Sequence, residues 1–172
     1  MTYHLDQSIE ILKRTPDTLN QMLRGLSDKW IYQNEGTGTW SPFDVVGHLI
    51  HGEKTDWIPR MMKILHDNNK EFVPFDRFAQ YEISRGKSLN QLLDEFSLLR
   101  IGNIRELENQ NISEDDLMKT GRHPNFGEVS LAQLLSCWTV HDLNHISQIS
   151  RVMAKQYKEA VGPWVEFLKI LH

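Results

Sequence analysis

The sequence predicts an all-α protein, most simply four main helices packed as a bundle. Three observations support this fold class: long segments with apolar residues every three or four positions, capping residues ahead of these segments, and no alternating segment longer than a few residues. The 172 residues, 40% of them hydrophobic and 24% charged, fit one domain spanning residues 1–172.

The first helical segment covers residues 5–26. Its apolar positions follow a helical rhythm that Thr15 and Pro16 interrupt. Threonine is a favourable N-cap and proline is favoured at the first helical position, so we interpret these residues as the start of a second helix. The segment is predicted to be a short helix ending near Arg14, followed by a helix from Pro16 to about Leu26.

The second long helix is predicted from Pro42 to about His66. Ser41 is its N-cap, Pro42 its first residue, and Asp44 the capping-box acid three positions after the cap. Pro59 lies inside this span, where its ring clashes with a carbonyl of the preceding turn and removes one backbone hydrogen bond. We therefore expect a kink or an early break near Pro59.

Residues 67–87 lack a sustained periodicity but are too rich in aromatic residues for a disordered linker. A structured crossover of this length can travel the height of a bundle, so the helices on either side of it can run parallel. Ser88 then caps a third helix. Its predicted apolar face consists of Leu89, Leu92, Leu93, Phe96 and Leu99.

The fourth long helix follows a segment with another capping signal, at Ser113. Residues 121–127, with the sequence GRHPNFG, are rich in turn-forming residues and are predicted to be a loop. Ser130 opens a helix that reaches about Tyr157, and a last short helix begins near Pro163.

Charge and cysteine content exclude several classes of protein. The formal net charge of −4, with lysine and arginine scattered along the chain, argues against a nucleic-acid-binding protein. No apolar run approaches the roughly 20 residues that span a membrane, and the N-terminus lacks a signal-peptide pattern. We therefore expect a cytoplasmic protein, in which the single cysteine, Cys137, is an inert thiol packed within the fourth helix.

Two histidines four residues apart, His141 and His145, lie on the apolar stripe of the fourth helix. Buried imidazoles need partners for their ring nitrogens, and one divalent cation can satisfy both rings. His48, early in the second helix, supplies a third ligand from another helix, although the spacing leaves His51 as an alternative. Three histidines with an open position are typical of a catalytic metal site.

Other polar residues have weaker candidate roles. Asp44 and Asp142 either orient the imidazoles or act as a cap and a solvated charge. Glu53 is a candidate general base or fourth ligand, and His51 and His123 are further candidate proton acceptors.

Two connecting segments are candidate walls of a pocket over the metal: the crossover from Phe72 to Tyr81 and the loop at residues 121–127. Trp57 and Trp138 are expected either to line the cavity or to belong to the core. Arg122 and the histidine after it either bind an anionic substrate or stabilise their loop.

These motifs resemble those of the DinB/YfiT-like superfamily of metalloenzymes, over essentially the whole chain and within an uncharacterised branch of that family. The family pattern places one histidine after a tryptophan and a capped helix start, as in GTWSPFDVVGHLIHGEKTDWIPR, and an H-x-x-x-H pair in the fourth helix, as in WTVHDLNHISQI. The matching positions are His48, His141 and His145.

The resemblance implies a four-helix bundle with up-down-down-up connectivity and a divalent metal, commonly nickel, zinc or iron, held by three histidines and water. It also implies frequent homodimers. Some relatives transfer low-molecular-weight thiols such as bacillithiol or mycothiol to electrophiles, and one group isomerises maleylpyruvate with a thiol cofactor.

The favoured hypothesis is a metal-dependent enzyme that joins a low-molecular-weight thiol cosubstrate to a small-molecule electrophile, in which the cation lowers the pKa of the thiol. A metal-stabilised binding or stress-response protein without turnover is one alternative, which a closed four-coordinate site would favour. A metal-dependent hydrolase, with water as the nucleophile, is the other alternative.

Overall fold

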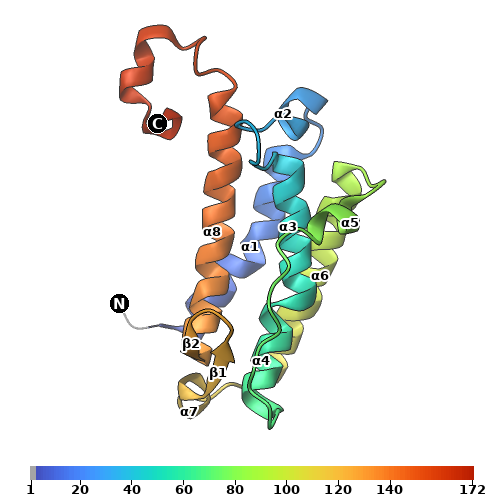
Figure 1. The fold of residues 1–172 in the computed structure, drawn as a ribbon, viewed down its shortest axis with the longest axis vertical. Coiled ribbons are helices and arrows are strands. Elements are labelled where there is room, and N and C mark those ends of the chain that lie inside the picture. The colour runs from blue at the N-terminus through green and yellow to red at the C-terminus, as the bar shows by residue number, and fades with distance from the viewer. Residues whose placement is uncertain (1–2) are drawn as a thin grey trace.

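The computed structural model describes residues 3–172, and four long helical segments form a bundle (Figure 1). These segments are α1 (Leu5–Leu23), α3 (Pro42–Thr55) continued by α4 (Trp57–His66), α6 (Leu89–Asn109) and α8 (Leu131–Lys155). Figure 1 shows that α1 and α8 run in one direction, while α3, α4 and α6 run in the other. The predicted four-helix bundle with up-down-down-up connectivity is therefore confirmed.

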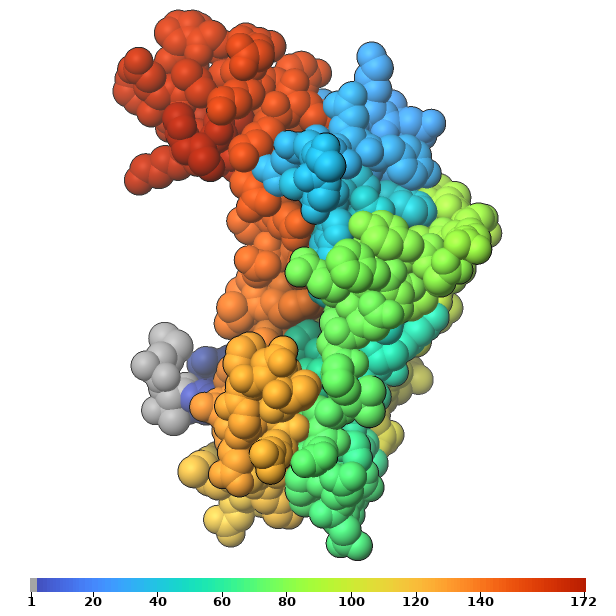
Figure 2. All heavy atoms as spheres, viewed as in Figure 1, coloured from blue at the N-terminus to red at the C-terminus, as the bar shows by residue number. Residues whose placement is uncertain are grey.

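The remaining elements are short. They are α2 (Asp28–Tyr32), α5 (Gln80–Ser84), α7 (Glu114–Met118), β1 (Thr120–His123), β2 (Gly127–Ser130) and the 3-10 turns η1 (Gly162–Phe167) and η2 (Lys169–Leu171). Figure 2 shows that the C-terminal turns project beyond the bundle at the end where α8 finishes. Within residues 3–172, no helix combines the length and the apolar character that crossing a membrane requires.

Capping boxes begin three of the long helices at the predicted residues. The hydroxyls of Ser41, Ser88 and Ser130 each accept a hydrogen bond from the backbone N–H three positions later, and the side chain at that later position accepts from the backbone N–H of the serine. Each box satisfies two backbone donors that the first turn of a helix otherwise leaves free. The helix starts are therefore fixed locally.

Helix α1 is continuous through Pro16, so the prediction of two helices meeting at Thr15 is wrong. Proline has no backbone N–H, and the helical hydrogen bond to the carbonyl of Leu12 is lost. That carbonyl instead accepts a hydrogen bond from Nη1 of Arg100 at 2.8 Å. The helix continues because a buried side chain of α6 replaces the missing donor.

The second long helix breaks at Asp56, between α3 and α4. The φ of −111° and ψ of −69° at Asp56 depart from regular helical values. Pro59 then falls in the first turn of α4, where a missing N–H costs little because that N–H has no helical partner. The predicted break is confirmed, one turn ahead of the proline.

Residues 120–130 form an antiparallel β-hairpin rather than the predicted loop. Gly127 adopts a φ of +72° at the turn, which glycine tolerates better than other residues. The crossover packs beside β1, because the N–H of Phe72 donates to the carbonyl of Arg122 at 2.9 Å. A Cβ at Gly121 would lie 2.5 Å from the ring of Phe72, so this close approach requires glycine.

The apolar core is divided into two clusters along the bundle. One cluster includes Leu19, Leu49, Phe96 and Ile149, and the other includes Leu12, Trp57, Ile104 and Trp138. Along each long helix, buried polar residues lie between the two clusters. This polar layer consists of Thr15, Glu53, Arg100, Asp142 and His145. The candidate site is built beside it.

Candidate metal centre and its pocket

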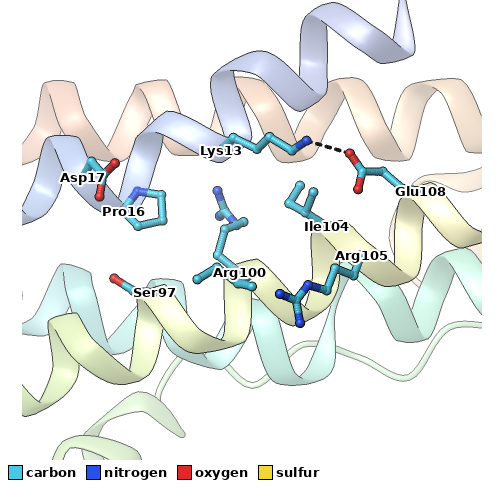
Figure 3. Close-up of a pocket in the computed structure, with 9 residues that line it drawn as sticks. Lys13, Pro16, Asp17, Ser97, Arg100, Ile104, Arg105 and Glu108 are labelled. Carbon is cyan, nitrogen blue, oxygen red and sulfur yellow. Dashed lines mark hydrogen bonds and ion pairs between the residues drawn. The ribbon is translucent and has the colours of Figure 1, made fainter.

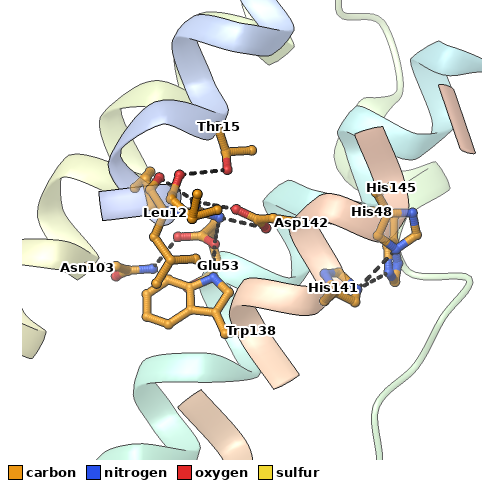
Figure 4. A network of polar contacts seen from close by, with 11 residues as sticks. Leu12, Thr15, His48, Glu53, Asn103, Trp138, His141, Asp142 and His145 are labelled. Carbon is orange, nitrogen blue, oxygen red and sulfur yellow. Dashed lines mark hydrogen bonds and ion pairs between the residues drawn. The ribbon is translucent and has the colours of Figure 1, made fainter. Parts of the chain in front are cut away.

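Three imidazoles from two facing helices converge beside the polar layer (Figure 4). His48 lies on α3, and His141 and His145 lie one turn apart on α8. The Nε2 atom of His141 lies 3.1 Å from Nε2 of His48 and 3.1 Å from Nε2 of His145. One candidate ligand atom from each of the three rings lies within 4.8 Å of the others. The structure therefore brings together the three residues that the sequence singled out.

The spacing of these nitrogens fits a shared cation. Two imidazole nitrogens bound to one ion at about 2.0–2.1 Å lie about 2.9–3.4 Å apart for bond angles of about 90–110°. Hydrogen bonding fits less well, because a ring nitrogen carries either one proton or one lone pair, whereas Nε2 of His141 has two close neighbours. The donor set suits a divalent transition metal such as zinc, nickel or iron.

Burial keeps the three rings in their neutral form. Desolvation, together with the charges of neighbouring groups, lowers the pKa of His48 to about 3 and that of His141 to about 2. Burial also lowers the pKa of His145. At neutral pH the lone pairs of these rings are therefore available to a metal ion.

Gln148 fixes the tautomer of His145. Its side-chain oxygen lies 2.8 Å from Nδ1 of His145 and accepts the ring proton there. The lone pair of His145 is consequently on Nε2, which faces the other two histidines. Gln148 was not predicted from the sequence, although its spacing of three residues from His145 puts both side chains on one face of the helix.

The structure places His48, and not His51, in the cluster. His51 is buried against the ring of Phe75, with centroids 4.6 Å apart, and burial lowers its pKa. Phe75 also meets the ring of His48 edge-on at 5.4 Å, and Trp40 packs on His48 at 4.7 Å. His51 thus contributes to the aromatic surroundings of the cluster rather than to its donor set.

A pocket of about 330 Å³ lies beside His48 and His141. The crossover and the hairpin supply part of its wall, as predicted for these two segments. Its apolar lining consists of Trp57, Phe72, Phe75, Phe126, Val129 and Leu134. Trp57 also meets the ring of His141 edge-on at 5.0 Å, whereas Trp138 is a fully buried core residue. A pocket of this size and lining suits a small, largely apolar molecule.

A buried ion pair is the main polar feature of the pocket wall. Oδ1 of Asp56 lies 2.6 Å from Nε of Arg60, and both residues line the pocket. Burial raises the pKa of Asp56 to about 6, against the opposing effect of Arg60. This pair was not predicted from the sequence, although the spacing of four residues between Asp56 and Arg60 is typical of an ion pair on one helix face.

His123 and Cys137 also line the pocket, in states that differ from those predicted. The backbone N–H of Asn125 donates to Nδ1 of His123 at 3.1 Å, so the neutral ring carries its proton on Nε2 and donates rather than accepts there. Cys137 is exposed, so the prediction of a packed thiol is wrong. Desolvation by nearby atoms and the charge of Asp56 raise the pKa of this thiol, which is protonated at neutral pH.

The geometry agrees with a comparison to known proteins. The model of the DinB superfamily matches residues 11–149, a span that includes all three histidines. The chain belongs to the DinB superfamily. This assignment agrees with the resemblance carried by the histidine motifs.

Named relatives of this DinB-superfamily protein occur in bacilli. A Bacillus cereus protein named "Putative metal-dependent hydrolase" is 23% identical over 149 residues, covering 85% of this chain and 83% of the relative. A Bacillus anthracis protein of the same name matches with the same identity and coverage.

Solved structures share the fold of this DinB-superfamily protein. YfiT from Bacillus subtilis, described as "a probable metal-dependent hydrolase with an unusual four-helix bundle topology", superposes with a TM-score of 0.72 at 20% identity, covering 92% of this chain and 87% of YfiT. A DinB-like protein from Bacillus cereus ATCC 10987 gives a TM-score of 0.60 at 15% identity, covering 91% of this chain and 95% of that protein.

In this DinB-superfamily protein, both oxygens of Glu53, the candidate general base or fourth ligand, already accept hydrogen bonds. One of its oxygens accepts from Nη2 of Arg100 at 2.8 Å and from the indole of Trp138 at 3.1 Å. The other accepts from Asn103 at 2.9 Å (Figure 4). Both oxygens are thus occupied by N–H donors, away from the histidine cluster.

The two aspartates considered as imidazole partners have other roles. Asp142 accepts from Arg100 at 2.6 and 3.1 Å in a two-point contact, and it is fully buried. Asp44 completes the capping box of α3. Arg100 engages both Glu53 and Asp142, and its role was not predictable from the sequence because the two contacts span 47 and 42 residues.

A second cleft, of about 360 Å³, lies between α1 and α6 (Figure 3). Pro16, Arg100 and Ile104 line it, and an ion pair of 2.6 Å joins Lys13 to Glu108 at its edge. None of the three clustered histidines lines this cleft. The pocket beside His48 and His141 is therefore the better candidate for a reaction site.

Proposed function

We propose that this DinB-superfamily protein is a divalent-metal-dependent enzyme that hydrolyses a small, largely apolar substrate. The observation that carries the proposal is the convergence of three Nε2 atoms, with neighbouring atoms 3.1 Å apart, beside an aromatic pocket. The names of the relatives and of YfiT support hydrolysis as the reaction class.

The roles of the side chains follow from their positions. His48, His141 and His145 would hold the cation through Nε2, and three protein ligands leave coordination positions open. When bound, the cation would supply Lewis acidity and lower the pKa of a coordinating water or thiol. The apolar, aromatic wall lowers the local polarity, which strengthens electrostatic interactions inside the pocket. His123 is placed to donate a hydrogen bond from Nε2 to a substrate in the pocket.

Thiol transfer to a small electrophile is the second candidate, and the state of Glu53 favours it. Hydrolysis benefits from a carboxylate that accepts a proton beside the metal, and both oxygens of Glu53 are held by N–H donors. A low-molecular-weight thiol needs less help, because its ordinary pKa, about 8.5, is much closer to neutral pH than that of water, about 15.7. A metal-stabilised binding protein is the third candidate. It would be favoured if the protein turned over substrates of neither class.

The first experiment is elemental analysis of untagged protein, before and after reconstitution with zinc, nickel or iron(II). We expect about one equivalent of metal in the wild type. His48→Ala and His145→Ala should each lose it. His51→Ala is the matched control, since His51 is a buried histidine of the same helix outside the cluster. A wild-type protein that stays metal-free after reconstitution would overturn the proposal.

A second experiment separates the reaction classes. The metal-loaded protein is assayed against a panel of aromatic esters and amides, and separately against aromatic electrophiles with added thiols. Turnover of the first panel without a thiol supports hydrolysis, whereas strictly thiol-dependent turnover of the second supports transfer. His145→Ala should abolish either activity.

We also propose that the protein is a cytoplasmic homodimer. Apolar side chains are exposed on the outer face of α8, at Val140 and Leu143, and on the projecting C-terminal turns, at Trp164 and Phe167. Exposed apolar side chains of this kind favour association with a second copy. Light scattering coupled to gel filtration should give twice the mass of the chain, and Phe167→Glu should shift it toward the monomer.

A further inference from the structure

We infer that Glu53, Arg100 and Asp142 form a buried, net-negative charge layer that strengthens cation binding by the three histidines. This inference rests on the proposed metal-dependent function. It gives Glu53 and Asp142 a positioning role in which neither carboxylate touches the cation. The effect would be exerted through charge and through the relative placement of the helices that carry the histidines.

Arg100 joins the two carboxylates of the layer by direct contacts. The guanidinium of Arg100 reaches Glu53 at 2.8 Å and Asp142 at 2.6 Å, and it donates to the carbonyl of Leu12 at 2.8 Å. Arg100 is 1% exposed, Glu53 is 3% exposed and Asp142 is 0% exposed. One cation and two carboxylates give the layer a formal charge of −1. Burial by itself lowers the pKa of Arg100. The two carboxylates have the opposite and larger effect, so the pKa of Arg100 is raised.

The layer adjoins the histidines on the helix that supplies two of them. Asp142 follows His141 directly and precedes His145 by three residues, and Figure 4 shows it between Glu53 and the imidazoles in this view. Glu53 lies on α3, which carries His48. The layer therefore ties α3 to α8 through Arg100, at the level where the imidazoles from these two helices meet.

The charge balance explains why such a layer is useful. A buried net charge without a counter-charge is unfavourable in an apolar interior. The three imidazoles are neutral, so a divalent cation bound to them brings a charge of +2 into the same interior. The negative layer and the cation then attract each other through a protein interior that screens charge only weakly. A change of about 1.4 kcal/mol in this attraction alters the metal affinity about tenfold.

A purely mechanical role makes a different prediction. If the layer only holds the helices together, weakening it lowers the stability of the metal-free protein and leaves metal affinity nearly unchanged. If its charge matters, removal of one negative charge weakens metal binding even where the fold is intact.

The test measures the dissociation constant for Zn²⁺ by competition with a chromophoric chelator, and the thermal midpoint with and without metal. Asp142→Asn and Glu53→Gln each remove one negative charge at nearly constant shape, from two different helices. We expect each to raise the dissociation constant at least about tenfold and to reduce the thermal shift that metal produces. Asn103→Ala is the control, because it removes two hydrogen bonds to Glu53 without changing charge. It should lower the metal-free midpoint but change the dissociation constant less than about threefold.

The outcomes separate the two proposals. A wild type that binds no Zn²⁺ overturns the metal-dependent function itself. Wild-type binding with unchanged affinity in both charge variants overturns the role of the charge layer alone, as does an equal loss in Asn103→Ala. Should one charge variant not fold, the other carries the same test, because the two carboxylates lie on different helices.

Discussion

Replacement of Arg100 by methionine should destabilise the metal-free protein by about 3–5 kcal/mol, the usual cost of removing one partner from a buried ion pair. The side chain is 1% exposed and contacts two buried carboxylates and the free carbonyl of Leu12. Methionine keeps much of the volume but leaves Glu53 and Asp142 without a counter-charge. For a chain of this size, the loss corresponds to a lowering of Tm by roughly 6–20 °C.

Urea denaturation of the wild type and Arg100→Met in the presence of EDTA, at pH 7, measures this effect. Lys13→Met is the matched control, because the Lys13 and Glu108 side chains are 52% and 44% exposed and such pairs contribute at most about 1 kcal/mol. A deficit below about 1 kcal/mol in Arg100→Met would refute the reasoning.

Three further predictions concern parts of the fold outside the polar layer. Hydrogen bonding by Arg151, opposed by partial burial, lowers the pKa of Glu35 from 4.5 to about 2, so Glu35→Gln should cost about 1 kcal/mol at pH 7. Because the folded-state pKa is depressed, this stabilisation is present above pH 4.5 and lost as the pH falls toward 2, and urea titrations at several pH values should show the two proteins converging. Gly121→Ala places a Cβ 2.5 Å from Phe72 and should cost about 1–3 kcal/mol, with increased amide exchange in the hairpin; wild-type stability would contradict the packing described. Ser41→Ala removes the cap of α3 and should lower the free energy of unfolding by about 1 kcal/mol in the same assay, without abolishing metal binding.

The helix starts could be predicted from the sequence because their causes are local. Ser41, Ser88 and Ser130 bond to backbone groups within three residues, so the relevant partners are visible in a short window. The break near Pro59 could be predicted for the same reason, because proline disrupts a helix through its own ring and its missing N–H. The continuity of α1 through Pro16 is not local, since it depends on a donor from Arg100. The hairpin was missed because its strands have four residues each, too few for a clear alternation.

In the candidate site too, some features follow from the local sequence and others depend on packing between helices. The spacing of His141 and His145 places both rings on one helix face, which a helical wheel predicts. The choice between His48 and His51 depends on the rotation of α3 against α8, a property of packing that spacing alone does not give. The pairing of Glu53 and Asp142 with Arg100 joins three helices, and nothing in the local sequence of either acid indicates it.

The polar layer also restricts how the helices can be arranged. Apolar helices can slide or rotate against one another at small cost, because one leucine contact resembles the next. A shift of α6 by one turn, about 5.4 Å, would carry Arg100 away from both carboxylates and from the carbonyl that Pro16 leaves free. A single polar residue at the interface of a coiled coil selects one register over its neighbours in the same way. Arg100 thus sets the vertical alignment of four helices, and through that alignment the height at which histidines from separate helices meet.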